Sequence, residues 1–193
     1  MNNQSVGYSL ERLFIGCAIL LASDLLNLVN LAGVSAGILR IVGIVITMIA
    51  LSKLNPYDPG YGRAFNWEII SLVFAVISVV VVFVAALIPF LLWLVAPVIM
   101  AVNVLLDYLV VHNMCQATAN LAGDAGDLDT AALGATADKV YLICCGVGIC
   151  GALLQIIPFL GALLPVGFLG DLATTAGWGL VVYFLYRGKT SLS

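Results

Sequence analysis

Charged residues are scarce in this chain. Lysine, arginine, aspartate and glutamate together make up 9% of its 193 residues, whereas 63% are hydrophobic. A soluble domain carries about 25% charged residues, so this chain has too few charges to solvate a globular surface. Its 7 basic and 10 acidic residues give a net charge of −3, which argues against nucleic acid as a partner because nucleic-acid binding needs a basic face. The composition predicts an integral membrane protein whose main partner is the lipid bilayer.

Patterns typical of catalytic and metal sites are also missing. The chain has a single histidine, His112, and its five cysteines form no CxxC pair. A zinc or haem site needs several ligands at characteristic spacings. The sequence contains no HExxH and no glycine-rich phosphate loop. We therefore expect no catalytic residue, no metal site and no cofactor, and we predict that the protein is not an enzyme.

Long apolar runs, by contrast, extend through the whole chain. Three blocks, 10–54, 67–111 and 140–186, are each about twice as long as the roughly 20 residues that cross a bilayer. Glycines, prolines or small polar residues interrupt each block near its middle, where they weaken a helix. The predicted fold is a single all-α domain, a polytopic membrane helix bundle of six transmembrane helices arranged as three antiparallel hairpins. The expected spans are 10–31, 36–54, 67–88, 90–112, 139–157 and 168–187.

Pro97 complicates the fourth of these spans. Proline removes a backbone donor and clashes with the preceding turn, but membrane helices tolerate it where neighbouring groups satisfy the freed carbonyl. Two interpretations remain at this point: Pro97 kinks the fourth helix, or it ends that helix and shortens the span.

The basic residues predict the orientation. With six spans, both termini and both polar loops share one side, and six of the seven basic residues fall on it; Arg40 is the exception. Basic residues in short loops favour the cytoplasmic side. We therefore predict a protein of the cell (inner or plasma) membrane with both termini in the cytoplasm. The six residues are Arg12, Lys53, Arg63, Lys139, Arg187 and Lys189.

Asp24 and Arg40 are ionisable residues inside predicted spans, which are expensive and by default suggest function. They lie equally far from the expected turn near residue 32, so antiparallel helices place them opposite each other. One interpretation is a neutralising ion pair that joins the first two helices. The other is that Asp24, Asn27 and Asn30 form a polar stripe that faces a cavity.

Further polar residues occur in the later spans. Asn103 and Asp107 share one face of the fourth span; we expect Asn103 to make an interhelical hydrogen bond and Asp107 to reach interfacial water. Asp171 is expected to cap the last span, since carboxylates suit helix amino termini. Alternatively, Asp171 lines an outward-facing vestibule for a polar ligand together with Gln155 and Trp178. The candidate ligand-binding residues are therefore Asp24, Asn27, Asn30, Arg40, Asn103, Asp107, Gln155, Asp171 and Trp178.

Two further patterns concern helix ends and helix packing. We expect the fourth helix to continue to about Leu121, and Asp127 or Asp129 to cap a helix that leads into the fifth span. Small residues recur at four-residue spacing on the last two spans and predict close helix packing. These residues are Cys144, Gly148 and Ala152 on one span and Ala173 and Gly177 on the other.

Two resemblances bear on function. Residues 51–54 (LSKL) and 60–65 (GYGRAF) resemble the first cytoplasmic loop of small, uncharacterised bacterial multi-pass membrane proteins, a resemblance that implies no activity. In size and helix number the chain is also similar to the substrate-binding subunits of energy-coupling-factor vitamin transporters. Those subunits dock through alanine-rich motifs on an early helix, where this chain has only Gly16, Ala18, Ala22 and Ser23.

Two functions follow from these observations. The first, which the sparse polar residues favour, is a non-catalytic membrane component that assembles with itself or with another membrane protein. The second is a small-solute binding or transport subunit. A transport subunit requires a polar cavity between the hairpins, whereas an assembly component should be tightly packed with its polar groups mutually satisfied.

Overall fold

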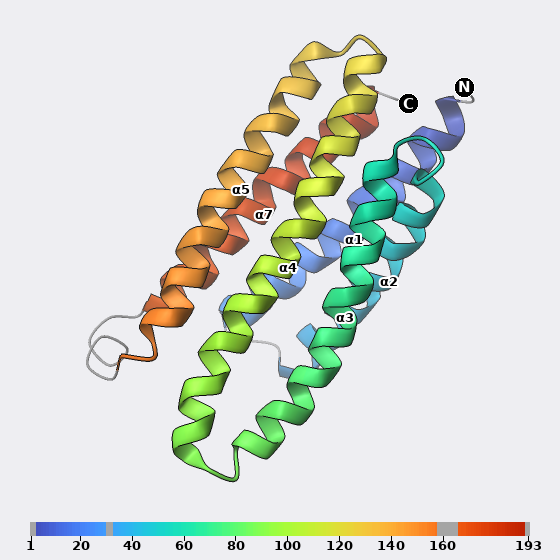
Figure 1. Cartoon of the computed structure of the whole chain (residues 1–193). Helices are drawn as coiled ribbons and strands as arrows, with labels where there is room; N and C mark the ends of the chain where they lie inside the picture. Colours follow the sequence, from blue (N-terminus) through green and yellow to red (C-terminus); the bar gives the residue numbers. More distant parts are fainter. Residues whose placement is uncertain (1–2, 30–32, 158–165, 192–193) are drawn as a thin grey trace.

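The computed structural model describes residues 3–29, 33–157 and 166–191. Within these ranges the protein forms six long α-helices and no strand (Figure 1). The predicted all-α, six-helix architecture is confirmed. The helices are α1 (Asn3–Leu28), α2 (Gly33–Leu54), α3 (Pro59–Ala85), α4 (Pro89–Asp124), α5 (Leu128–Leu154) and α7 (Val166–Ser191).

The six helices pack as a closed ring. α1 contacts α2 and α7, α5 contacts α7 and α4, and α3 closes the ring between α4 and α2. Successive helices run in opposite directions (Figure 1). α1 therefore begins and α7 ends at the same end of the bundle as the α2–α3 and α4–α5 turns, which we call the terminal end. The arrangement has the three antiparallel hairpins that the sequence predicted.

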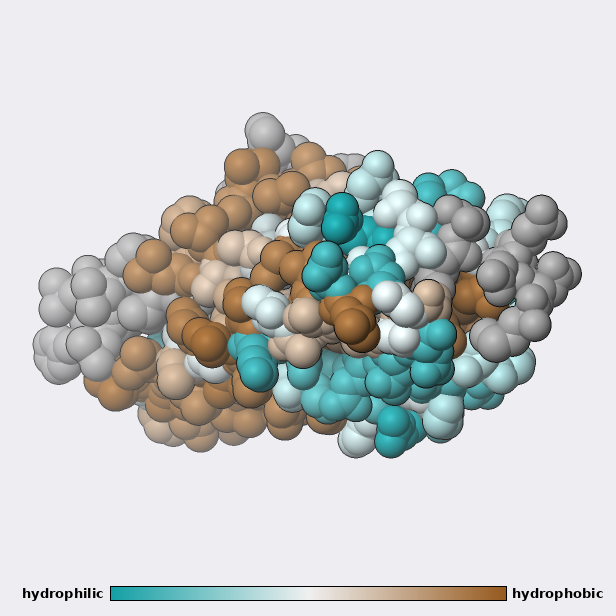
Figure 2. Space-filling view, turned by 90° about the horizontal axis from the view of Figure 1, so that it is seen from above, coloured by the Kyte–Doolittle hydropathy of each residue, from teal (hydrophilic) through white to brown (hydrophobic). Residues whose placement is uncertain are grey.

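Five of these helices, α2, α3, α4, α5 and α7, are long and apolar enough to cross a membrane. α1 is not among these five candidates, and it carries three charged residues, Glu11, Arg12 and Asp24. The outer surface of the bundle is strongly apolar: on α3, for example, Val79 is 71% and Phe83 is 74% exposed. Seen from above the view of Figure 1, hydrophilic residues gather on one side of the molecule and hydrophobic residues cover the other side (Figure 2). The protein is thus a multi-pass membrane protein.

α4 is a single helix of 36 residues that contains Pro97 in its interior. The alternative in which Pro97 ends the helix is therefore wrong. α4 also runs past the expected end of the span at residue 112, and α5 begins 11 residues before the expected 139. The two helices are joined by a short turn in which Gly126 has a φ of +86°, a conformation that L side chains rarely adopt. Most of the segment between the fourth and fifth spans is therefore helical, as the predicted continuation of the fourth helix to about Leu121 indicated.

The predicted small-residue contact between the last two helices is confirmed. A Cβ added to Gly170 would lie only 3.2 Å from the Gly148 Cα, and one added to Gly177 would lie 3.1 Å from the Cys144 Cβ. Hydrogen in place of a side chain therefore lets the backbones of α5 and α7 approach closely, as in other membrane helix pairs.

Asp127 is the residue that caps α5, as predicted. Its carboxylate accepts hydrogen bonds from the Thr130 hydroxyl at 2.6 Å and from the Thr130 backbone N–H at 2.9 Å. These bonds lower the pKa of Asp127 from 3.8 to about 2. Because the folded-state pKa is depressed, the stabilisation is complete above pH 3.8 and disappears as the pH falls towards 2.

We therefore expect Asp127→Asn to lower the thermal unfolding midpoint at pH 5 and to have a much smaller effect at pH 2. The midpoint can be followed by circular dichroism of the protein in detergent. Asp129→Asn is the matched control, since Asp129 lies in the first turn of the same helix but makes none of the cap hydrogen bonds. An Asp127→Asn effect of equal size at both pH values would contradict this role.

Candidate functional site

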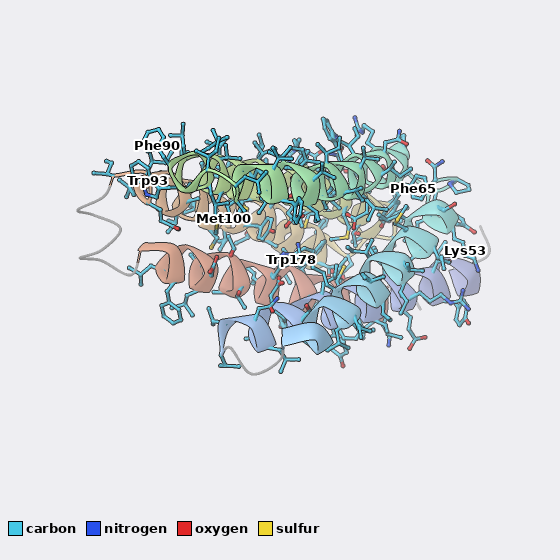
Figure 3. The ribbon with its side chains drawn as sticks, turned by 90° about the horizontal axis from the view of Figure 1, so that it is seen from below. Lys53, Phe65, Phe90, Trp93, Met100 and Trp178 are labelled. Carbon is cyan, nitrogen blue, oxygen red and sulfur yellow. The ribbon has the colours of Figure 1, made fainter. Side chains whose placement is uncertain are left out.

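A cavity of about 480 Å³ lies inside the ring of helices, and all six helices contribute to its wall. We call it the central cavity. Trp178, one of its lining residues, lies midway along the bundle, between Trp93 near one end and Lys53 near the other (Figure 3). Its wall combines apolar side chains with an unusual number of polar ones. The polar and aromatic lining residues are Asp24, Asn27, Arg40, Thr47, Glu68, Ser71, Asn103, Asp107, Tyr141, Asp171, Thr174, Thr175 and Trp178.

Arg40 links three helices across this cavity. Its Nη1 lies 3.0 Å from the Asp24 Oδ1, and its Nη2 lies 3.5 Å from the Asp107 Oδ2. The predicted pairing of Asp24 with Arg40 is confirmed. The expectation that Asp107 only reaches interfacial water is wrong, because α4 turns this carboxylate towards the guanidinium on α2. One guanidinium is thus shared by two carboxylates from different helices.

Glu68 is an acidic residue of the cavity that the sequence analysis missed. It lies on α3, it is only 8% exposed, and it lines the central cavity. It makes no hydrogen bond and no ion pair with any side chain of the described residues. A signal was present in the sequence: Glu68 and Asp107 are the only acidic residues of the apolar block 67–111. Because Glu68 falls at the edge of that block, it resembles an ordinary interfacial residue.

Asp171 also lines the cavity, but it is not a helix cap. α7 begins at Val166 and has no acidic residue in its first turn, so Asp171 lies in the second turn, and the expected capping role is wrong. Its carboxylate makes no hydrogen bond or ion pair within the described part of the chain. Three further candidate residues from the sequence analysis also line the cavity: Asn27, Asn103 and Trp178.

One candidate residue, Gln155, does not line the cavity. Its backbone carbonyl accepts a hydrogen bond from the Trp93 Nε1 at 3.2 Å, and its side chain lies against Gly167. Of the three residues expected to line a common site, only Asp171 and Trp178 do so, and Gln155 does not. Asn30 lies outside the described residues.

Two aromatic rings form part of the cavity wall. Tyr141 on α5 and Trp178 on α7 stack edge to face, with ring centroids 5.7 Å apart and an interplanar angle of 68°. Both are largely enclosed, since Tyr141 is 1% and Trp178 is 8% exposed. The sequence analysis did not identify Tyr141, because no charged or motif-forming neighbour marks it. The aromatic wall and the carboxylates therefore face one common space.

The chemistry of this wall suits a polar solute better than a metal ion. Among the described residues, no three of the histidine, cysteine, aspartate and glutamate side chains group so as to hold a metal ion. The cavity volume falls within the range of about 300–1,000 Å³ that is usual for small-molecule sites. Comparisons with protein-family models, with curated proteins and with solved structures found no match, so the role of the cavity is inferred from its own residues.

Proposed function

We propose that this protein is a non-catalytic membrane protein that binds or transports a small polar solute in its central cavity. The observation that carries the proposal is Glu68, a buried carboxylate that faces the volume between the helices and forms no ion pair with any described residue. Ionisable residues within membrane helices are costly and usually mark a path or site for polar solutes. An assembly component has no need of such a group, whereas a solute-binding subunit does.

The arrangement of charges supports this distinction. Asp24, Arg40 and Asp107 satisfy one another, as they would in a purely structural bundle. Glu68 and Asp171 are not satisfied in this way, although both line the same cavity. Transporters of several folds bind their substrates between helices near the middle of the membrane, and Trp178 lies midway along this bundle.

We also propose that α1 is a sixth membrane span. Other helices compensate both of its negative charges: Glu11 accepts from the Lys189 Nζ at 2.8 Å, and Asp24 pairs with Arg40. An even number of spans puts both chain ends on one side, and the basic residues favour the cytoplasmic side of the cell membrane. A protease-sensitive tag on either terminus should then be cleaved only from the cytoplasmic side.

The solute-binding proposal predicts that water-soluble reagents reach the cavity. We expect a cysteine introduced by Asn103→Cys to react with a small hydrophilic thiol reagent, because the reactive thiolate forms only where water has access. Leu105→Cys is the matched control, since Leu105 lies two residues along the same helix, outside the cavity lining, and is 48% exposed on the apolar flank. Peptide mass spectrometry assigns the modification to the introduced residue, so the native cysteines remain in place.

Modification at position 103 should be at least about tenfold faster than at position 105, given how strongly thiol reactivity depends on its surroundings. Unfolded protein should modify both positions at similar rates, which shows that the reagent itself does not distinguish them. Equal, slow modification of the two variants in folded protein would mean that the cavity is closed to water, and the proposed function would then be wrong.

A further inference from the structure

The charges that line the central cavity are mainly negative. Four carboxylates, those of Asp24, Glu68, Asp107 and Asp171, face the cavity with one guanidinium, that of Arg40. Arg40 forms ion pairs with Asp24 and Asp107. It also attracts Glu68 electrostatically, but among the described residues it forms no ion pair with Glu68 or Asp171. The cavity therefore has an excess of acidic groups that its own residues do not balance.

The excess of negative charge has its largest effect at Glu68, because this side chain is buried. Glu68 is only 8% exposed, and a buried carboxylate without an ion-pair partner costs free energy unless a counter-charge or a proton neutralises it. Among the described residues Arg40 attracts Glu68 without forming an ion pair with it, whereas a cationic ligand in the adjoining cavity would contact the carboxylate directly. The position of Glu68 in the cavity wall is thus explained by a positively charged solute.

The remaining wall indicates what kind of cation this is. Trp178 and Tyr141 line the same volume, and aromatic faces attract organic cations such as substituted ammonium groups. A bare metal ion instead requires several oxygen ligands converging on one point, and the described residues form no such group. The volume of about 480 Å³ is also far larger than a metal ion occupies.

We infer that the central cavity binds a small organic cation, with Glu68 as its counter-ion and Trp178 as part of an aromatic wall. This inference rests on the proposed function, because it assigns a chemical class to the solute of the same cavity. A substituted ammonium or guanidinium head would contact the carboxylate of α3, and its apolar substituents would contact the rings of α5 and α7.

The first experiment compares two probes of the same shape and different charge. Choline and 3,3-dimethylbutan-1-ol differ in that a carbon replaces the positively charged nitrogen. Calorimetry on the purified full-length protein in nanodiscs should give saturable binding of choline or of methylguanidinium, and an affinity for the neutral alcohol at least about tenfold lower than for choline. Equal affinities for choline and the alcohol would overturn the inference, as would the absence of binding by both cations up to about 10 mM.

The second experiment tests Glu68 itself. Glu68→Gln should weaken binding of the cation at least about tenfold, whereas Glu68→Asp should retain part of the affinity. Glu11→Gln is the matched control: it removes one negative charge that lies away from the cavity lining and is paired with Lys189. Equal weakening by Glu68→Gln and Glu11→Gln would indicate only a general charge effect and would overturn the inference.

A stability measurement separates loss of binding from loss of folding. Without ligand, Glu68→Gln should unfold at a higher temperature than the wild type, because the substitution removes an uncompensated buried charge. A variant that binds less because it is misfolded would unfold at a lower temperature, and that result would overturn the role of Glu68 as counter-ion. If Asn103→Cys is accessible to water and the neutral alcohol binds as well as choline, the solute-binding function stands and only the cationic class is wrong.

Discussion

Replacing Arg40 with methionine should produce the largest loss of stability of any single substitution that preserves side-chain volume in this protein. The guanidinium lies 3.0 Å from Asp24 and 3.5 Å from Asp107, so the substitution leaves carboxylates on α1 and α4 without a counter-charge. Breaking a buried ion pair costs about 3–5 kcal/mol. Because Arg40 is 44% exposed, towards the cavity and its surroundings, we expect about 3 kcal/mol, the lower end of that range. The free energy of unfolding can be measured by titration with sodium dodecyl sulfate in mixed micelles.

A rescue experiment separates charge from packing. The triple variant Asp24→Asn/Arg40→Met/Asp107→Asn removes all three charges and should recover most of the lost stability, since replacement of a whole ion group by neutral residues is often nearly neutral. Arg40→Lys should be intermediate, because a single ammonium cannot present the planar fork that contacts two carboxylates. If the triple variant is no more stable than Arg40→Met, packing and not charge is the role of Arg40.

The second large effect is expected for Gly16→Leu, at the closest approach of α1 and α2. A Cβ added at Gly16 would lie 2.5 Å from the Thr47 Oγ1 and 2.9 Å from the Thr47 backbone nitrogen. The side chain could rotate away, but the backbone nitrogen belongs to a continuous helix and can move only if α2 moves with it. Overpacking of this kind typically costs about 1–3 kcal/mol, and we expect the upper part of that range. The loss in the free energy of unfolding can be measured by the same titration with sodium dodecyl sulfate.

Gly37→Leu is the matched control for this substitution. Gly37 lies on α2, and a Cβ added there would meet no atom within 4 Å. The same change of residue should therefore alter the free energy of unfolding little, since it fills open space and favours the helix. Equal destabilisation by the two leucines would show that the contact of Gly16 with Thr47 does not limit how closely α1 and α2 pack.

Several features of the structure could be predicted from local pattern. The three apolar blocks predict the helices because length and hydropathy decide whether a segment can cross lipid. Asp24 and Arg40 could be placed opposite each other by counting equal numbers of residues from the turn along two antiparallel helices. This count requires no knowledge of the other four helices. The Asp127 cap is equally local, because it depends on a carboxylate three residues before a backbone N–H.

The errors have a common physical origin. The helix that contains Asp171 begins at Val166, six residues earlier than a cap at Asp171 would require, whereas the expected span began only at residue 168. Asp107 and Glu68 were misjudged or missed because the outside of a membrane helix is as apolar as its inside. Without a polar face to indicate rotation, the sequence does not tell which residues of α3 and α4 point towards the bundle.

By itself, the sequence determined that this chain belongs in a membrane, folds into long antiparallel helices and places Asp24 opposite Arg40, since these depend on composition, segment length and neighbouring spans. Only the tertiary structure decided that the helices close into a ring and that Glu68, Asp107, Tyr141 and Trp178 face one cavity. The physical reason is that closure depends on how each helix is rotated about its axis. That rotation is set by contacts between residues far apart in the chain, such as the approach of α7 to α1 and of α3 to α2.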